Sequence, residues 1–280
     1  MLRIVTDGAA DILPEWAKEY GIDMIPVNIL FGEKSYLQGV ELDNEGFYKL
    51  VEESKRIPKT SQPSPHQFVE FYRKIAQKGD TILSIHITAK LSGTYASAVA
   101  AAEELKGEFN IIPIDSAVGS LGIGLLCREA RKMERAGKSV DDIVKYVENI
   151  KSKIRVILTL DTLEYAKMSG RVKALQAALA SVLNVKPIAI LSDGVLNMAE
   201  RVRTRKASLE RVLAIGKEEF GDKPVYLGVV HARDLKSGQA LLEDAKKHFN
   251  AKETMISELA ISIAANLGPG TVGLILYPAE

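Results

Sequence analysis

Residues 80–105, which read DTILSIHITAKLSGTYASAVAAAEEL, contain an apolar run, a short polar segment and an alanine-rich run in that order. The apolar run 80–88 is nearly continuous, which is typical of a strand buried on both faces of a sheet. The run 94–105 has the composition of a helix. A second apolar run follows at 109–116, and strand–helix–strand order of this kind predicts a parallel, doubly wound sheet.

The same alternation covers the rest of the first half of the chain. We expect strands at 2–7 and 23–31 and helices at 14–20 and 44–54. In parallel α/β sheets, ligands gather at the carboxyl ends of the strands. Three polar segments follow predicted strands and should therefore share one edge of the sheet: TDGAAD (6–11), ITAKLSGT (87–94) and DSAVGS (115–120).

The second half has a different pattern. A charged helical region at 128–153 leads away from the first sheet, so we place a domain boundary at its end. Asp193-Gly194 joins two extended runs and is a strong hairpin signal. The fold class is predicted as α/β, with a parallel-sheet α/β domain over 1–154 and a mixed α+β domain over 155–280. The second domain should also contain a helix at 235–249 and strands at 155–160, 224–232, 253–260 and 271–278.

Composition and charge exclude several classes of protein. The chain has 280 residues, 46% of them apolar and 26% charged, and a formal net charge of +1. That length favours two domains, and the balanced charge argues against binding to nucleic acid or to an anionic membrane surface. We find no signal-peptide pattern and no apolar stretch of about 18 residues, the length that a membrane span needs. With a single cysteine, Cys127, the sequence predicts a cytoplasmic protein without a disulfide or stable membrane insertion.

No catalytic or metal-binding motif is complete. Residues 268–273 (GPGTVG) match a dinucleotide-binding pattern, but that motif needs a helix after it, and a strand is expected there. The four histidines lack metal-ligand spacing, and His86 is expected to be a buried structural residue. Asp7 and Asp11 could hold a hard cation, although Asp11 is explained more simply as a turn or cap residue. The sequence therefore offers no complete catalytic constellation, and we expect no metal and no cofactor.

Two segments rich in hydroxyl groups remain. PKTSQPSP (58–65) contains three prolines, which exclude a helix and hold the hydroxyl side chains on a stiff, extended backbone. LSGTYASA (91–98) begins a helix after a strand, with Ser92 or Thr94 expected near its N-cap. The N–H groups and dipole of a helix start attract anions, although plain capping would also explain one of these hydroxyls. Together the two segments predict a small, neutral cradle of hydrogen-bond donors.

Several motifs occur along the chain in the order and spacing of one protein family. They are IVTDGAADIL (4–13), KTSQPSP (59–65), LSGTYASA (91–98), IDSAVGSLGIG (114–124), TLEYAKMSGRV (162–172), LNVKPI (183–188) and GPGTVGL (268–274). Over essentially its whole length the chain resembles the DegV family of bacterial fatty-acid-binding proteins, which present an acyl chain to a separate fatty acid kinase. Each motif alone is modest, and their agreement in order makes the resemblance specific.

The resemblance implies that a tunnel between and within the two domains buries the tail of a long-chain fatty acid, with the carboxylate near the surface. Hydroxyl groups of the TSQPS and SGT motifs would bind that carboxylate. Carried over by position, the binding residues are Thr60 and Ser92, supported by Ser61, Gly93 and Thr94. Weaker candidates are Arg171 and the backbone of 268–271.

Three positions depart from the usual pattern of the family. Gly8 stands where a serine usually follows the aspartate of the first motif, and Ser169-Gly170 replaces a glycine pair. Asn266 stands where a histidine commonly lies near the ligand carboxylate. Asparagine can donate a hydrogen bond but carries no charge. Recognition of the carboxylate by this chain is therefore expected to be weaker, less pH-dependent or tuned to a different ligand.

The resemblance also implies a function. The protein would be a non-catalytic carrier whose ligand is a long-chain fatty acid and whose partner is a fatty acid kinase, with tunnel walls from 174–185 and 258–267. Two alternatives stay open: a hydrolase or phosphotransfer enzyme that uses Ser92, and a regulatory or scaffold protein with a structural lipid. No motif encodes the length or unsaturation of the chain, the oligomeric state or the partner surface. One basic group would suit a partner, although surface charge is usually only solvated: Arg171, Arg201, Arg203 and Arg205.

Overall fold

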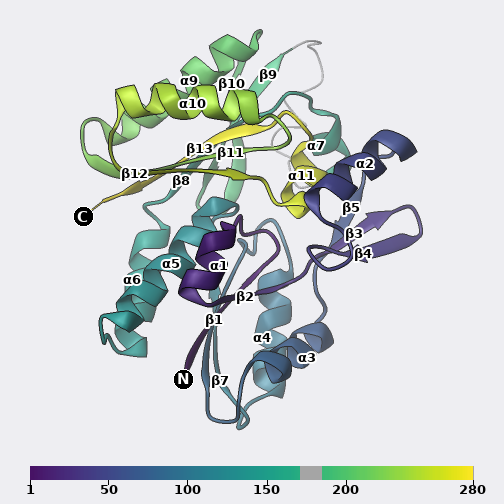
Figure 1. Ribbon diagram of the computed structural model, residues 1–280, viewed down its shortest axis with the longest axis vertical. Coiled ribbons are helices and arrows are strands. Elements are labelled where there is room, and N and C mark those ends of the chain that lie inside the picture. Colours follow the sequence, from purple (N-terminus) through teal and green to yellow (C-terminus); the bar gives the residue numbers. More distant parts are fainter. Residues whose placement is uncertain (171–184, 280) are drawn as a thin grey trace.

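The computed structural model describes residues 1–170 and 185–279 and places a parallel sheet below a mixed sheet (Figure 1). The parallel sheet has four strands in the order β2-β1-β6-β7, and every neighbouring pair is parallel. The strands are β1 (Leu2–Asp7), β2 (Ile22–Ile25), β6 (Thr81–His86) and β7 (Asn110–Asp115). The parallel α/β fold predicted for the first half of the chain is confirmed.

Helices cover both faces of this sheet, as a doubly wound fold requires. Successive residues of β1 show it: Ile4 belongs to the core cluster that contains Leu121, and Val5 to the cluster that contains Phe68. The helices of this half are α1 (Pro14–Tyr20), α3 (Pro65–Ile75), α4 (Thr94–Glu104), α5 (Leu121–Arg135) and α6 (Val140–Lys151). α5 begins at Leu121, before the charged residues that predicted it, because its first two turns are apolar and buried.

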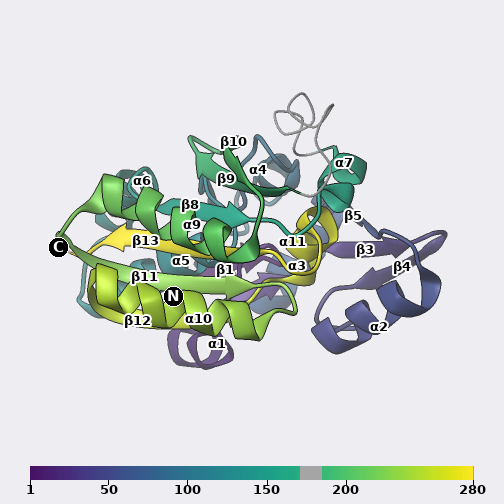
Figure 2. The same cartoon turned by 90° about the horizontal axis from the view of Figure 1, so that it is seen from above.

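The mixed sheet has six strands in the order β10-β9-β8-β13-β11-β12. Only β11 and β12 are parallel neighbours, and α9 and α10 cover the outer face of this sheet (Figure 2). Asp193 and Gly194 form the predicted hairpin turn, with φ values of 50° and 76°. The elements are β8 (Arg155–Thr159), β9 (Lys186–Ser192), β10 (Val195–Val202), α9 (Arg205–Phe220), β11 (Pro224–His231), α10 (Leu235–His248), β12 (Asn250–Glu258) and β13 (Val272–Pro278).

α5 lies between the two sheets. Gly228 on β11 faces it so closely that a Cβ at this position would lie 2.4 Å from Leu121 Cδ2, and glycine permits this approach. Buried apolar residues of α5 and of both sheets form one continuous core cluster. The division of the chain into domains at residue 154 stays a prediction.

A third sheet, with three antiparallel strands in the order β4-β3-β5, was not predicted. The run 23–31, expected as a single strand, is divided at Pro26, because proline has no N–H to donate to a sheet. β2 joins the parallel sheet and β3 joins the small one, whose third strand lies in the extended PKTSQPSP segment. The elements are β3 (Asn28–Phe31), β4 (Lys34–Leu37), α2 (Asn44–Ser54) and β5 (Lys59–Ser61).

Two short helices of the C-terminal half lie near the small sheet, and one of them contacts it. α7 (Glu164–Ser169) and α11 (Ile261–Leu267) pack together, and α11 also contacts β3 and β5. The C-terminal half of the chain therefore reaches the small sheet of the N-terminal half. Within residues 1–170 and 185–279, no helix is long and apolar enough to cross a membrane.

Candidate functional site

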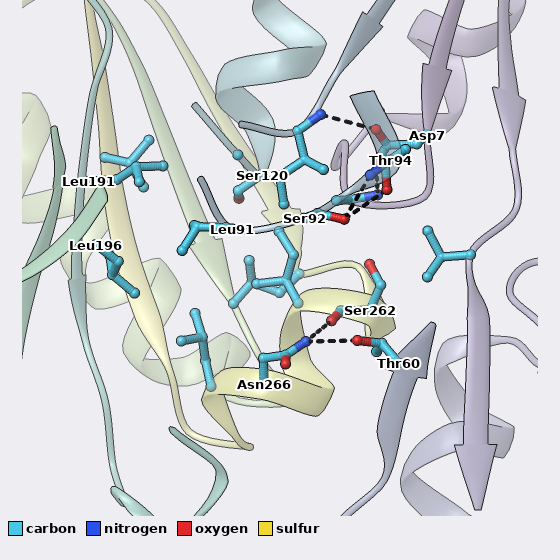
Figure 3. Close-up of a pocket in the computed structure, with 18 of the residues that line it drawn as sticks. Asp7, Thr60, Leu91, Ser92, Thr94, Ser120, Leu191, Leu196, Ser262 and Asn266 are labelled. Atoms are coloured by element: carbon cyan, nitrogen blue, oxygen red, sulfur yellow. Dashed lines mark hydrogen bonds between the residues drawn. The ribbon is translucent and has the colours of Figure 1, made fainter. Parts of the chain in front are cut away.

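A pocket lies where the three sheets meet (Figure 3). It has about 860 Å³ of empty space, open solvent at its mouth included. Its walls come from β1, β5, β8, β9, β10, α4, α11 and the loops that follow β6 and β7. One end of the pocket is polar and the other is aliphatic.

Ser92 and Thr94 lie at the polar end, where the loop after β6 enters α4. Their hydroxyl oxygens are 2.8 Å apart, and Ser92 Oγ also accepts from the backbone N–H of Thr94 at 3.3 Å. The N-cap of α4 is Gly93, between them, and it supplies no side-chain acceptor to the helix. Ser92 therefore satisfies the first N–H of α4, and both hydroxyls also line the pocket.

Gly93 lies directly against the segment that carries Thr60. A Cβ at position 93 would lie 2.3 Å from Gln62 Oε1, so a side chain there would displace Gln62. Gln62 donates from Nε2 to Ser97 Oγ at 3.2 Å, which joins its segment to α4. The two hydroxyl-rich segments of the sequence therefore meet at the polar end.

Thr60 lies beside Asn266 of α11 (Figure 3). The side-chain amide of Asn266 donates to Thr60 Oγ1 at 3.4 Å and to the Ser262 carbonyl at 2.7 Å, so both of its hydrogens are used. Ser262 also lines the pocket, and its hydroxyl donates to the Gly8 carbonyl at 2.8 Å. Ser61 is exposed, because side chains of a strand alternate in direction and Thr60 points inward.

Gly8, one of the departures from the family pattern, has a structural partner. A Cβ at position 8 would lie 2.6 Å from Gln38 Oε1. Gln38 is buried and donates from Nε2 to the Gly8 carbonyl at 2.8 Å. The space that a larger residue would need is therefore occupied by this glutamine.

Asp7 is a fully buried carboxylate at the polar end of the pocket. It accepts from the backbone N–H groups of Ala9 (2.8 Å) and Ile87 (3.0 Å), and it lies 3.0 Å from His86 Nδ1. The other ring nitrogen of His86 lies 2.7 Å from Ser84 Oγ. His86 thus has a partner on each nitrogen, as expected for a structural histidine. In the described part of the chain, no cluster of three or more His, Cys, Asp or Glu could hold a metal ion.

Asp11 joins two elements of the polar end through hydrogen bonds. It is buried, accepts from the hydroxyl of Ser120, which lines the pocket, and accepts from the backbone N–H of Ala260 at 2.7 Å. Ala260 is the N-cap residue of α11. Burial raises the pKa of Asp11 to about 7, although both hydrogen bonds act in the opposite direction.

The aliphatic end is built mainly by the mixed sheet. Val156 and Leu158 on β8, Leu191 on β9 and Leu196 on β10 line it. The predicted lining segment 258–267 contributes its aliphatic residues Leu259, Ile263 and Leu267. Of the other predicted lining segment, 174–185, all but the last residue lies outside the described part of the chain.

Comparison with known proteins agrees with this architecture. A family profile described as "Uncharacterised protein, DegV family" matches residues 1–279. The chain belongs to the DegV family. It is 32% identical over 278 residues to a DegV domain-containing protein of Halalkalibacterium halodurans, covering 99% of this chain and 98% of the relative.

Solved structures of DegV proteins share the whole fold. One is a DegV family protein from Thermus thermophilus, whose structure was described for its fatty acid binding. It is 30% identical to this chain, with a TM-score of 0.89. The DegV of Bacillus subtilis, described as a fatty acid binding protein, is likewise 30% identical with a TM-score of 0.89. Each similarity covers 99% of both chains.

The fold of this DegV protein brings most of the candidate residues to one place. Thr60, Ser92, Thr94 and Asn266 line the pocket, and Gly93 lies between two of them. Ser61 points away, and Arg171 lies outside the described residues.

Sequence reasoning missed several residues of the site. Gln62 was within a quoted motif but was not singled out, and Ser120 follows a predicted strand. Ser262 lies four positions before Asn266, a spacing that places both on one face of a helix, and this signal could have found it. No pattern in the neighbouring sequence pointed to Leu191 or Leu196, because their place in the pocket depends on how the mixed sheet packs.

Proposed function

We propose that this DegV protein binds a long-chain fatty acid in the pocket, with the carboxylate at the polar end and the tail at the aliphatic end. The observation that carries the proposal is the division of one pocket into a hydroxyl-lined end and an aliphatic end. Burial of each CH₂ group contributes about 0.8 kcal/mol, so a long chain supplies more than about 10 kcal/mol before ordering costs. Affinity then comes mostly from the tail, and the polar end fixes its orientation.

The carboxylate would be held by neutral donors. Thr60 Oγ1 accepts from Asn266, which leaves the Thr60 O–H for the ligand. The Ser92–Thr94 pair uses one O–H internally and keeps the other. The start of α4 adds backbone N–H groups and a favourable dipole. We assign Asn266 the role of orienting Thr60, since both of its amide hydrogens are already used.

The two halves of the chain would share this task. Residues 1–154 carry Thr60 and Ser92, and we propose that they form the headgroup domain. Residues 155–280 supply Leu158, Leu191 and Leu196, and they would form much of the tunnel wall.

We further propose that the protein presents the acid to a fatty acid kinase in the cytoplasm and catalyses nothing itself. A nucleophilic serine needs a base within hydrogen-bond reach, whereas the side-chain partner of Ser92 is the hydroxyl of Thr94. Of the basic group suggested as a partner surface, Arg205 is engaged with Asp234 at 2.7 Å. Arg201 and Arg203 are exposed and stay candidates for contact with the kinase.

Two experiments test these steps separately. Mass spectrometry of the denatured purified protein should release a long-chain fatty acid in near-stoichiometric amount, and exhaustive extraction without any acid would contradict the binding proposal. Reconstitution with a fatty acid kinase and ATP should then yield acyl phosphate. A loaded protein that yields none with an active kinase would favour the scaffold alternative.

A further inference from the structure

A second cavity lies behind the aliphatic end of the pocket. It holds about 730 Å³ of empty space, its mouth included, and lies between the end of α6, the start of β8 and the β9–β10 turn. Leu191 lines both cavities. Elsewhere a wall one residue thick separates the second cavity from the first pocket, called the acyl pocket below. At three places along this wall, one residue lines the acyl pocket and its neighbour in the sequence lines the second cavity. The pairs, with the residue facing the acyl pocket first, are Ile87 and Thr88, Gly119 and Val118, and Val156 and Arg155.

Leu191 fills the weakest point of this wall. It is only 4% exposed, and its Cδ2 atom lies 3.8 Å from the position that a Cβ of residue 119 would occupy. Because residue 119 is glycine, it adds no side chain to the partition there. The Leu191 side chain, with Ile87 Cδ1 at 3.9 Å from the same position, therefore closes this part of the pocket, and of these two residues only Leu191 borders both cavities.

The second cavity has the opposite chemistry to the pocket that it adjoins. Its described lining includes three basic residues, Lys90, Lys151 and Arg155, and two acidic ones, Asp115 and Asp193. Two of the basic residues already pair with carboxylates outside the lining, Lys151 with Glu148 at 2.7 Å and Arg155 with Glu219 at 2.5 Å. Lys90 Nζ donates to the Asp193 carbonyl at 2.7 Å and has no carboxylate partner in the described part of the chain. A methyl group gains nothing in such surroundings, whereas a terminal carboxylate could pair with Lys90.

We propose that Leu191 sets the maximum length of the bound acyl chain by closing the aliphatic pocket against this polar cavity. The inference rests on the proposed function, since it concerns the far end of the same ligand. In the native protein the methyl end stops at Leu191, and chains that are too long or carry a polar terminus are rejected. Loss of the Leu191 side chain joins the two cavities and admits a terminal carboxylate to Lys90.

The test compares Leu191→Ala with Leu196→Ala. Both variants remove the same side chain from the aliphatic end, but Leu196 does not border the second cavity. Monocarboxylic acids of increasing length, and α,ω-dicarboxylic acids, compete against the neutral fluorescent probe N-phenyl-1-naphthylamine. We expect Leu191→Ala to move the preferred chain length upward by about two or more carbons and to bind long dicarboxylic acids at least about tenfold more tightly than the native protein does. Leu191→Val should shift the preference in the same direction by less.

Three outcomes are distinguishable. An upward shift with gained dicarboxylate binding in the Leu191 variants alone supports the inference. An unchanged length preference in folded Leu191→Ala and Leu191→Val, or an equal shift in Leu196→Ala, overturns it while the proposed function stands. Failure of the native protein to bind any fatty acid overturns the proposed function itself.

Discussion

The two ends of the pocket are made in different ways. The polar end comes from short loops and a three-residue strand, and its donors are positioned by hydrogen bonds such as those of Asn266 and Gln62. The aliphatic end comes from neighbouring strands of the mixed sheet, where Val156, Leu158 and Leu191 are almost fully buried. The difference teaches that orientation and affinity are separable: a few replaceable donors set the first, and packed apolar area sets the second.

Filling the aliphatic end should have the largest effect on binding. A Cβ added at Gly119 would lie 3.8 Å from Leu191 Cδ2 and 3.9 Å from Ile87 Cδ1, which are ordinary contact distances, so the missing side chain leaves space in the pocket. Gly119→Leu would place a branched side chain in that space, and we expect fatty acid binding to fall by more than about 100-fold. Gly119→Ala is the matched control and should retain binding. Probe displacement measures both, and a full-affinity Gly119→Leu would show that the tail lies elsewhere.

The anchor behind the polar end should give a large effect on stability. The pKa of Asp11 is raised by burial from 3.8 to about 7, so the folded state holds a proton that the unfolded chain has lost. The free energy of unfolding should therefore fall as pH rises from about 4 to about 7, by on the order of 4 kcal/mol, and level off above.

Asp11→Asn removes the titrating group and keeps an oxygen for the Ala260 N–H. Urea unfolding of both proteins across this pH range should show the fall in the native protein only. If the free energies of unfolding of the two proteins changed with pH in the same way, Asp11 would not be buried as described.

Removal of single donors should have intermediate effects. Thr60→Val and Ser92→Ala are each expected to weaken fatty acid binding by about 1–3 kcal/mol while the protein stays folded. Ser61→Ala is the matched control, since this neighbouring hydroxyl is exposed. Unchanged affinity in both pocket variants would break the proposed division of roles and remove the headgroup assignment.

The smallest effect is expected at Asn266. Asn266→His would add a group that gains a positive charge near its usual pKa of about 6.5. Binding of a fatty acid should strengthen several-fold as pH falls through that value, whereas binding of a long-chain alcohol, which has no charge, should not. An equal change for both ligands would indicate a packing effect instead of a charge effect.

The sequence predicted the polar end of the pocket better than the aliphatic end. Most strands and helices around the parallel sheet were predictable because each depends on a short local pattern. The hydroxyl-rich segments were also visible locally, whereas Thr60 and Ser92 were singled out by the resemblance to the DegV family. The small sheet was missed because strands of three or four residues carry little pattern, and a single proline decides where 23–31 divides.

Contacts between residues far apart in the sequence could not be predicted from local patterns. Asp11 was expected as a local turn or cap residue, yet its carboxylate binds the N-cap residue of α11, 249 positions away. Leu191 and Leu196 look like ordinary core residues in the sequence. Their role at the aliphatic end depends on which strands of the mixed sheet become neighbours, and that is decided by the packing of the whole chain.

The most direct measurement is a crystal structure of the protein purified with its native ligand. The account predicts continuous elongated density with its forked polar end within hydrogen-bond distance of the Thr60 and Ser92 hydroxyls and its other end against Leu191. A pocket filled by ordered water or by side chains, or a ligand with its carboxylate among the leucines, would contradict it.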